Sequence, residues 1–204
     1  MSVFSQVAKE VSSDKLPYLN SRDGEYTLAL DKIKTVKGKA NGKEYRIAEF
    51  KVIESTPVPV TLLKQGEVAP VPFGVGSSVA FTIDMTSPYA GKDVAGLYAA
   101  ASGMNMEQFT TENKKSAEAA FKADKASSIE EAAEKFSLLA MADAKATSET
   151  NPMRGVAIKA TIERSVAGAK SKTPGAIFSN VRFAPLKDAN TKEAVAARRK
   201  ELGG

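Results

Sequence analysis

The chain has 204 residues, 43% of them hydrophobic, and a formal net charge of +5. This hydrophobic fraction supports a folded core and excludes an intrinsically disordered chain. Cysteine and histidine are both absent, which excludes disulfides, thiolate nucleophiles, most zinc sites and the commonest general base.

The first 23 residues predict an N-terminal arm, with a short amphipathic piece over residues 3–11 and a break at Pro17. The start of the chain lacks the layout of a signal peptide, and no apolar run approaches the length of a membrane-spanning helix. We therefore expect a soluble protein that stays in the compartment where it is made.

Residues 24–55 predict a long β-hairpin. Apolar side chains alternate from Gly24 and then change phase before Ile33, which indicates a bulge or strong coiling in the first strand. Residues 43–55 are rich in β-branched and aromatic residues, as is typical of a strand. Between the strands, Asn41-Gly42 tolerates positive φ. The loop KGKANGK carries three lysines and no acidic residue.

The middle of the chain predicts a loop, a strand and then helices. Residues 56–76 contain four prolines and three glycines, which predict an irregular connection, and residues 79–85 alternate as a third strand. A short helix from Asp93 ends near Gly103. Residues 105–150 predict a helical insertion, in which one long helix begins at the capping box of Ser128.

Strand alternation resumes at residues 155–165 and again at 176–183, on either side of the basic loop AGAKSKTPG. Three strands, a helix and two strands is the order of the OB-fold, a five-stranded, partly open Greek-key barrel. We therefore predict a mainly β fold with α elements, an OB-fold-like barrel over residues 24–186. The helical insertion, about residues 105–150, lies between its third and fourth strands, and residues 187–204 form a basic tail, helical or frayed.

The positive charge is concentrated in the predicted strands and their loops. Residues 32–51 contain seven Lys or Arg against two acids, and residues 154–172 contain five against one. Residues 107–145 contain six lysines against eight acids. OB-folds bind oligonucleotides or oligosaccharides between the loop joining strands 1 and 2 and the loop joining strands 4 and 5. In this chain those loops are the two basic, acid-free ones.

Single-stranded nucleic acid offers phosphates to cations and base faces to aromatic rings. The predicted phosphate contacts along the first hairpin are Lys32, Lys34, Lys37, Lys39 and Lys43. The cations predicted to line the groove are Arg46, Lys51, Lys159, Arg164, Lys170, Lys172 and Arg182. The predicted stacking rings are Tyr45 and Phe178. Phe178 has the opposite parity to Ile177, Val181 and Phe183, which predicts that it points away from the core. The alternatives are that the lysine-rich tip is only a solvated turn, and that the aromatic rings belong to the core.

No catalytic constellation is recognisable. Asp84 with Asp93, or Glu130 with Glu131, are the candidate carboxylate pairs, and helix capping explains the second pair better. The sequence has neither a dinucleotide-binding fingerprint nor a P-loop. We therefore expect no enzyme activity, no cofactor and no metal.

Five segments together resemble the single-stranded DNA-binding proteins encoded in tailed-phage replication modules. They are residues 24–28, 45–55, 76–85, the helix that ends at Gly103, and residues 175–185. The resemblance covers most of residues 24–104 and 154–186, without the helical insertion. It implies an OB-fold that coats single-stranded DNA during phage replication or recombination, in the host cytoplasm. Many such proteins end in an acidic tail that recruits partners, whereas this chain ends in the basic segment AVAARRKELGG.

We therefore predict a single-stranded DNA-binding protein with little sequence preference and no catalysis. Its expected partners are single-stranded DNA, phage replication or recombination proteins and further copies of the chain, and no membrane. The first alternative is a virion structural protein, such as a decoration or tail component with a β-barrel core. The second is a nuclease or polymerase accessory subunit that uses carboxylate-bound magnesium. The residue pattern does not separate DNA from single-stranded RNA.

Overall fold

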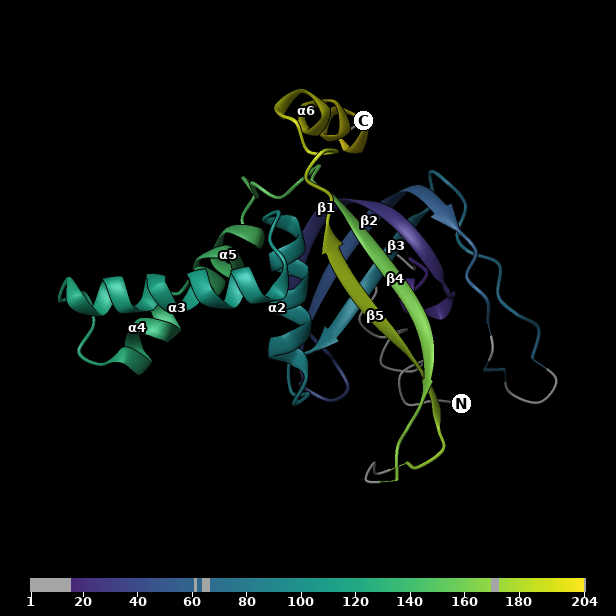
Figure 1. The fold of residues 1–204 in the computed structure, drawn as a ribbon, viewed down its shortest axis with the longest axis horizontal. Helices are drawn as coiled ribbons and strands as arrows, with labels where there is room; N and C mark the ends of the chain where they lie inside the picture. Colours follow the sequence, from purple (N-terminus) through teal and green to yellow (C-terminus); the bar gives the residue numbers. More distant parts are fainter. Residues whose placement is uncertain (1–15, 61, 64–66, 170–172, 204) are drawn as a thin grey trace.

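The protein is a mixed α/β structure built on one five-stranded antiparallel sheet, with strand order β3-β2-β1-β4-β5 (Figure 1). The computed structural model describes residues 16–60, 62–63, 67–169 and 173–203. The strands are β1 (Gly24–Lys37), β2 (Glu44–Thr56), β3 (Ser78–Asp84), β4 (Ala157–Val166) and β5 (Ile177–Pro185). The helices are η1 (Leu19–Ser21), α2 (Ala90–Ala101), α3 (Met106–Lys122), α4 (Ile129–Phe136), α5 (Leu138–Ala146) and α6 (Lys192–Leu202).

Strand β1 organises the sheet because it pairs on both sides. It pairs with β2 along its length, and its first half pairs with β4, from Gly24 opposite Ile162 to Ala29 opposite Ala157. The register between β1 and β2 shifts twice, between residues 27 and 28 and between residues 30 and 32. These irregularities confirm the change of phase predicted before Ile33, and such bulges increase the local twist of a strand.

The inner face of the sheet packs on α2. Leu28, Leu30 and Phe50 on this face form one buried cluster with Leu97 and Tyr98 of α2. The aromatic rings of Phe81 on β3 and Phe183 on β5 meet edge to face, with centroids 5.3 Å apart. In the described residues β3 and β5 are the two edge strands, and side chains rather than a hydrogen-bonded ladder bring them together. The result is an open sheet, compatible with an OB-like fold.

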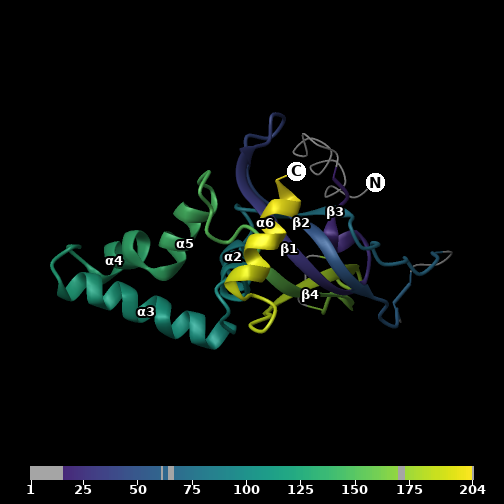
Figure 2. The ribbon, with the colours of Figure 1, turned by 90° about the horizontal axis from the view of Figure 1, so that it is seen from above.

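Helices α3, α4 and α5 project from the sheet beyond α2 (Figure 2). The prediction of one long helix from Ser128 is wrong, because Ser137 has extended backbone angles and separates α4 from α5. The Ser137 side chain accepts a hydrogen bond from the Ala140 N–H and caps α5. Helix α3 begins at Met106, directly after Asn105, which forms a capping box with Gln108.

The C-terminal segment is helix α6, which docks on the connection before β4. The guanidinium of Arg198 donates to the Gly155 carbonyl (2.6 Å), and that of Arg199 donates to the carbonyls of Arg154 (2.7 Å) and Pro152 (2.8 Å). Gly155 has a φ of +80°, and a Cβ there would lie 2.8 Å from the Val195 carbonyl oxygen. Two of the basic residues of the tail are therefore used to hold the helix in place. No helix in the described part of the chain is both long and apolar enough to cross a membrane.

Candidate nucleic-acid interface

The loop between β1 and β2, residues 37–43, forms an ordered turn that we call the basic finger. The Gly38 N–H donates to the Lys43 carbonyl (2.8 Å), and the Gly42 N–H donates to the Gly38 carbonyl (2.8 Å). Gly42 has a φ of +65°, which side chains disfavour, and a Cβ on Gly38 would lie 2.4 Å from the Asn41 Oδ1. The two glycines therefore close the turn tightly and hold its lysines at the tip.

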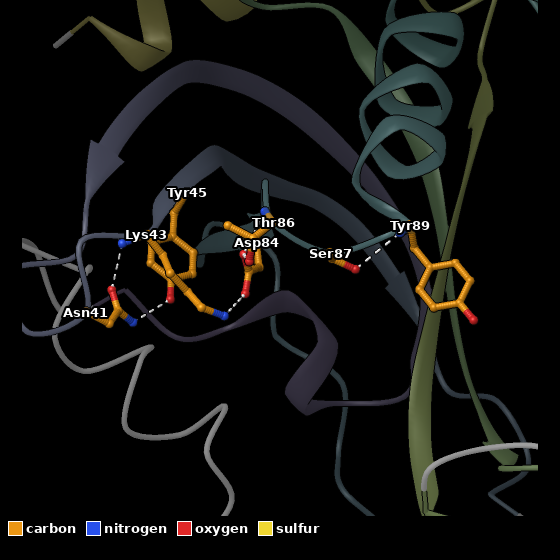
Figure 3. A network of polar contacts seen from close by, with 7 residues as sticks. All are labelled: Asn41, Lys43, Tyr45, Asp84, Thr86, Ser87 and Tyr89. Carbon is orange, nitrogen blue, oxygen red and sulfur yellow. Dashed lines mark hydrogen bonds and ion pairs between the residues drawn. The ribbon is translucent and has the colours of Figure 1, made fainter.

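Polar contacts fix the basic finger to the turn between β3 and α2 (Figure 3). The Asn41 side chain accepts from the Lys43 N–H (3.0 Å) and donates to the Tyr45 hydroxyl (2.9 Å). The Lys43 Nζ donates to Asp84 (3.0 Å), whose other carboxylate oxygen accepts from the N–H (2.9 Å) and hydroxyl (2.6 Å) of Thr86. The basic finger is therefore held in one place before any ligand arrives, which lowers the entropic cost of binding.

The contact between Lys43 and Asp84 is an ion pair at neutral pH. Burial raises the pKa of Asp84, but the hydrogen bonds from Thr86 and Lys43 outweigh it, so the net pKa lies below its usual value. The hydrogen bond to Asp84 and its negative charge raise the pKa of Lys43. The charge of Lys43 is thus partly balanced within the protein.

The cations predicted on the first hairpin fall into two groups. Lys37 and Lys39 are exposed, and neither has an ion-pair partner among the described residues. Lys32 and Lys34 both contact the carboxylate of Glu49, at 3.2 Å and 2.6 Å, and Glu49 is itself buried. Of the five lysines predicted to follow the phosphates along this hairpin, only Lys37 and Lys39 therefore carry charge that no described carboxylate balances.

Three predicted site residues are inside the protein, and these assignments need correction. Tyr45 is 1% exposed and packs with Ile47 and Ala80 on the outer face of the sheet, the face opposite the one that packs on α2, so its ring is not open for stacking. Arg46 points to the inner face, where it is buried and forms an ion pair with Asp143 of α5.

Arg164 is the third correction. Its guanidinium contacts the buried carboxylate of Asp23 (2.7 Å), that of Glu67 (2.8 Å) and the Leu62 carbonyl (3.1 Å). The side chain of Arg164 is only 11% exposed. It therefore joins the loop after β2 to the sheet instead of lining an open groove.

Strands β4 and β5 carry three further predicted residues, Phe178, Arg182 and Lys159. Phe178 is 45% exposed, which confirms the prediction from its parity that it points away from the core. The Arg182 side chain is 75% exposed, with Glu163 at 3.9 Å, and Lys159 pairs with Glu25 at 2.9 Å. In Figure 1 the ends of β4 and β5 that are joined by the β4–β5 hairpin lie on the same, lower side of the molecule as the basic finger.

Lys51 is half-buried on the outer face and lines a hollow of about 250 Å³ with Lys32, Glu49 and Leu202. It is set back from the basic finger. Lys170 and Lys172 lie outside the described residues.

Sequence reasoning missed Tyr89, the most exposed aromatic side chain among the described residues, at 69%. It lies in the turn between β3 and α2 that anchors the basic finger, and its N–H donates to the Ser87 hydroxyl (3.2 Å). In Figure 3 its ring projects from the start of α2. The sequence did contain a signal for this exposed ring: Tyr89 ends the polar segment Thr86-Ser-Pro-Tyr89, where no core position is expected.

The structure gives neither candidate carboxylate pair a shared site. Glu131 and Asp84 each have a separate structural role. The Glu131 N–H donates to the Ser128 hydroxyl (3.1 Å), and the Glu131 carboxylate accepts from the Ser127 N–H (2.8 Å), so this residue caps α4. Asp84 is bound to Lys43 and Thr86. Within the described ranges, no group of three or more acidic side chains could hold a metal ion.

Comparison with family models, curated proteins and solved structures finds no match to this chain.

Proposed function

We propose that this protein binds single-stranded DNA with little sequence preference and performs no catalysis. The observation that carries the proposal is the basic finger: two lysines without a described carboxylate partner, held by an ordered turn that is anchored to the β3–α2 connection, which also carries the exposed ring of Tyr89. The lysines would neutralise phosphates and release counterions, while Tyr89 and Phe178 offer faces on which bases stack. Lysine side chains suit this role because their ammonium groups accept many phosphate geometries.

The proposal includes a finer description of the fold, an OB-type barrel with α3, α4 and α5 as an insertion. The sheet order β3-β2-β1-β4-β5 is the order expected of such a barrel when it is opened between β3 and β5. The contact between Phe81 and Phe183 joins those two edges through side chains. In this fold the loops after β1 and β4 frame the ligand, and here both are basic.

The burial of Tyr45 changes the contact surface that we propose. Tyr45 and Ile47 are buried on the outer face of β2, and Leu16 packs over them. We therefore assign binding to the rim of the sheet, formed by the basic finger, the turn that carries Tyr89, and the exposed side of the β4–β5 hairpin.

The test is a titration of fluorescently labelled oligothymidylate, followed by anisotropy at several salt concentrations. Affinity should fall as salt rises and should exceed the affinity for a duplex of equal length. A single-stranded RNA of equal length, in a parallel titration, measures the preference for DNA. Absent binding, or binding that does not depend on salt, would refute the proposal.

A further inference from the structure

The loop after β2 carries an exposed apolar surface that nothing in the proposed DNA-binding role uses. We call it the valine ridge: Val68, Val71 and Val75, which are 85%, 74% and 72% exposed. Residues 68–76 contain no charged side chain. Large apolar side chains gathered on a surface, without charges between them, mark a site of interaction with another molecule.

The valine ridge is held outward by contacts of its neighbours. Phe73 is buried, its N–H donates to the Tyr26 hydroxyl (3.3 Å), and the two rings lie 6.2 Å apart. The Arg22 guanidinium lies 4.5 Å from the centre of the Phe73 ring and donates to the Val71 carbonyl (3.3 Å).

The sequence also stiffens the ridge. Ala69 and Val71 each precede a proline, which restricts residues 69–72 to an extended backbone. Because the backbone is restricted in this way, the exposed valines have few other conformations to adopt. A partner that covers them therefore pays little ordering entropy.

Helices α3, α4 and α5 form an arm that projects from the sheet, and a second apolar surface lies at its end, at the turn between α3 and α4. We call it the arm tip: Phe121, at the end of α3, is 42% exposed, and Ile129, at the start of α4, is 39% exposed. The buried cluster between α3 and α4 consists of small side chains, Ala117, Ala120 and Ala132, with Ala126 and Phe136 packed against it. Such a shallow core leaves the larger apolar side chains at the end of the arm in contact with water.

The two surfaces lie at opposite ends of the molecule. Both ribbon views place the α3–α4 turn at one end of the long axis and the loop after β2 at the other (Figures 1 and 2). Helix α2 and the whole sheet lie between them, so one copy cannot bring its own arm tip to its own valine ridge. A contact between these surfaces must join two molecules.

Charge favours the same pairing. Residues 107–145, which form most of the arm, contain six lysines against eight acids, whereas the whole chain has a net charge of +5. An arm therefore approaches the basic sheet half of another copy with favourable electrostatics, and another arm with unfavourable electrostatics. This asymmetry selects a head-to-tail contact over a symmetric arm-to-arm contact.

We propose that the arm tip of one copy packs on the valine ridge of the next, so that copies of this chain associate head to tail. A contact between two different surfaces does not close by two-fold symmetry, and it generates an open row of subunits unless the rotation forms a ring. This part rests on the proposed function: a row of subunits can follow a single strand of DNA, and the contact between neighbouring copies would make binding along the strand cooperative. The association itself does not depend on DNA.

The experiment uses two variants of the full chain, each with one surface removed. The ridge variant is Val68→Glu with Val71→Glu, and the tip variant is Phe121→Gln with Ile129→Gln. Sedimentation velocity without DNA, over a range of protein concentrations at low salt, should show the average mass of the unmodified chain rising with concentration. Each variant alone should stay monomeric, with a dissociation constant raised at least about tenfold, because each loses the burial of two apolar side chains. Thermal unfolding by circular dichroism checks that both variants are folded.

The decisive sample is an equimolar mixture of the two variants. The intact arm tip of the ridge variant can still bind the intact ridge of the tip variant, so the mixture should form heterodimers that do not grow further. A monomeric unmodified chain, a variant that associates alone, or a mixture that stays monomeric would each overturn the proposal. Titration of each variant with short oligothymidylate, long enough for one copy only, should give unmodified affinity. If the unmodified chain itself does not bind the oligothymidylate, that result counts against the proposed function and not against self-association.

Discussion

Replacing Lys37 and Lys39 with glutamine tests the basic finger directly. Both side chains are exposed and neither is balanced by a described carboxylate, so the double variant should fold as the unmodified chain does. The glycines that close the turn are unchanged, and the anchoring pair of Lys43 and Asp84 (3.0 Å) stays in place. The substitution therefore removes charge from the tip and leaves the geometry of the turn.

The expected magnitude follows from counterion release. On a single strand, each phosphate neutralised by the protein contributes about 0.7 to the slope of log affinity against log salt. Losing two such contacts should therefore reduce the slope by about 1.4. Between about 50 and about 200 mM salt, the affinity of the unmodified chain should then fall about sevenfold more than that of the variant.

The assay is the anisotropy titration with oligothymidylate at four or more salt concentrations. The matched control replaces Lys114 and Lys145 with glutamine. Both are exposed on the arm and lack a described ion-pair partner, and the control loses the same two positive charges as the finger variant. The control should keep the slope of the unmodified chain. An unchanged slope in the finger variant, or an equal decrease in the control, would show that the finger does not contact phosphates.

Tyr45→Ala removes a fully buried ring and should lower the free energy of unfolding by about 3–5 kcal/mol. Phe178→Ala should leave the free energy of unfolding in denaturant nearly unchanged and should weaken DNA binding by about 1–3 kcal/mol. Asp143→Asn leaves the buried guanidinium of Arg46 without its carboxylate and should lower the free energy of unfolding in urea by about 2 kcal/mol. This is less than the range for a fully buried pair, because the Asp143 side chain is 32% exposed. Adding Arg46→Met should recover part of that loss, and strictly additive costs would contradict the coupling. Hydrogen bonds at the start of α4 lower the pKa of Glu131 from 4.5 to about 2. Its contribution to stability is complete above pH 4.5 and is lost as the pH falls through about 2. The stability difference between the unmodified chain and Glu131→Gln should therefore disappear near pH 2, and a difference that persists there would contradict this assignment.

The strands could be predicted from the sequence because their signals are local. Alternation of apolar residues fixes which side chains share a face, and Asn41-Gly42 marks the turn within a few residues of its place. The same reasoning placed Phe178 on the exposed face, because parity relative to Val181 and Phe183 needs no distant information. Alternation does not say which face of a strand a remote segment covers.

The errors at the site come from contacts between residues far apart in the chain. Tyr45 is buried with Leu16 packed over its cluster, and Arg46 is turned inward by Asp143, a residue of α5. The break at Ser137 is a different kind of error. A serine at that position is compatible with a continuous amphipathic helix, and its role as a cap depends on the extended backbone adopted there.

Counting basic residues along the sequence also overestimates the surface that can bind an anionic strand. Twelve Lys and Arg were assigned to the interface, but described carboxylates already contact Lys32, Lys34, Lys43, Arg46, Lys159, Arg164 and, at 3.9 Å, Arg182. A cation that is paired inside the protein releases no counterion when DNA binds, unless its ion pair breaks at a cost comparable to the gain.

Among the described residues, four cations are left to act: the two at the finger tip, Lys51 and the weakly paired Arg182. Lys170 and Lys172 lie outside the described residues and could raise the number to six. Twelve phosphate contacts on a single strand would give a salt slope of about −8, whereas four to six give about −3 to −4. The smaller slope is the one that this pattern of ion pairs predicts. A measured slope near −8 would mean that the internal ion pairs open on binding, and it would contradict the smaller contact surface assigned to the rim of the sheet.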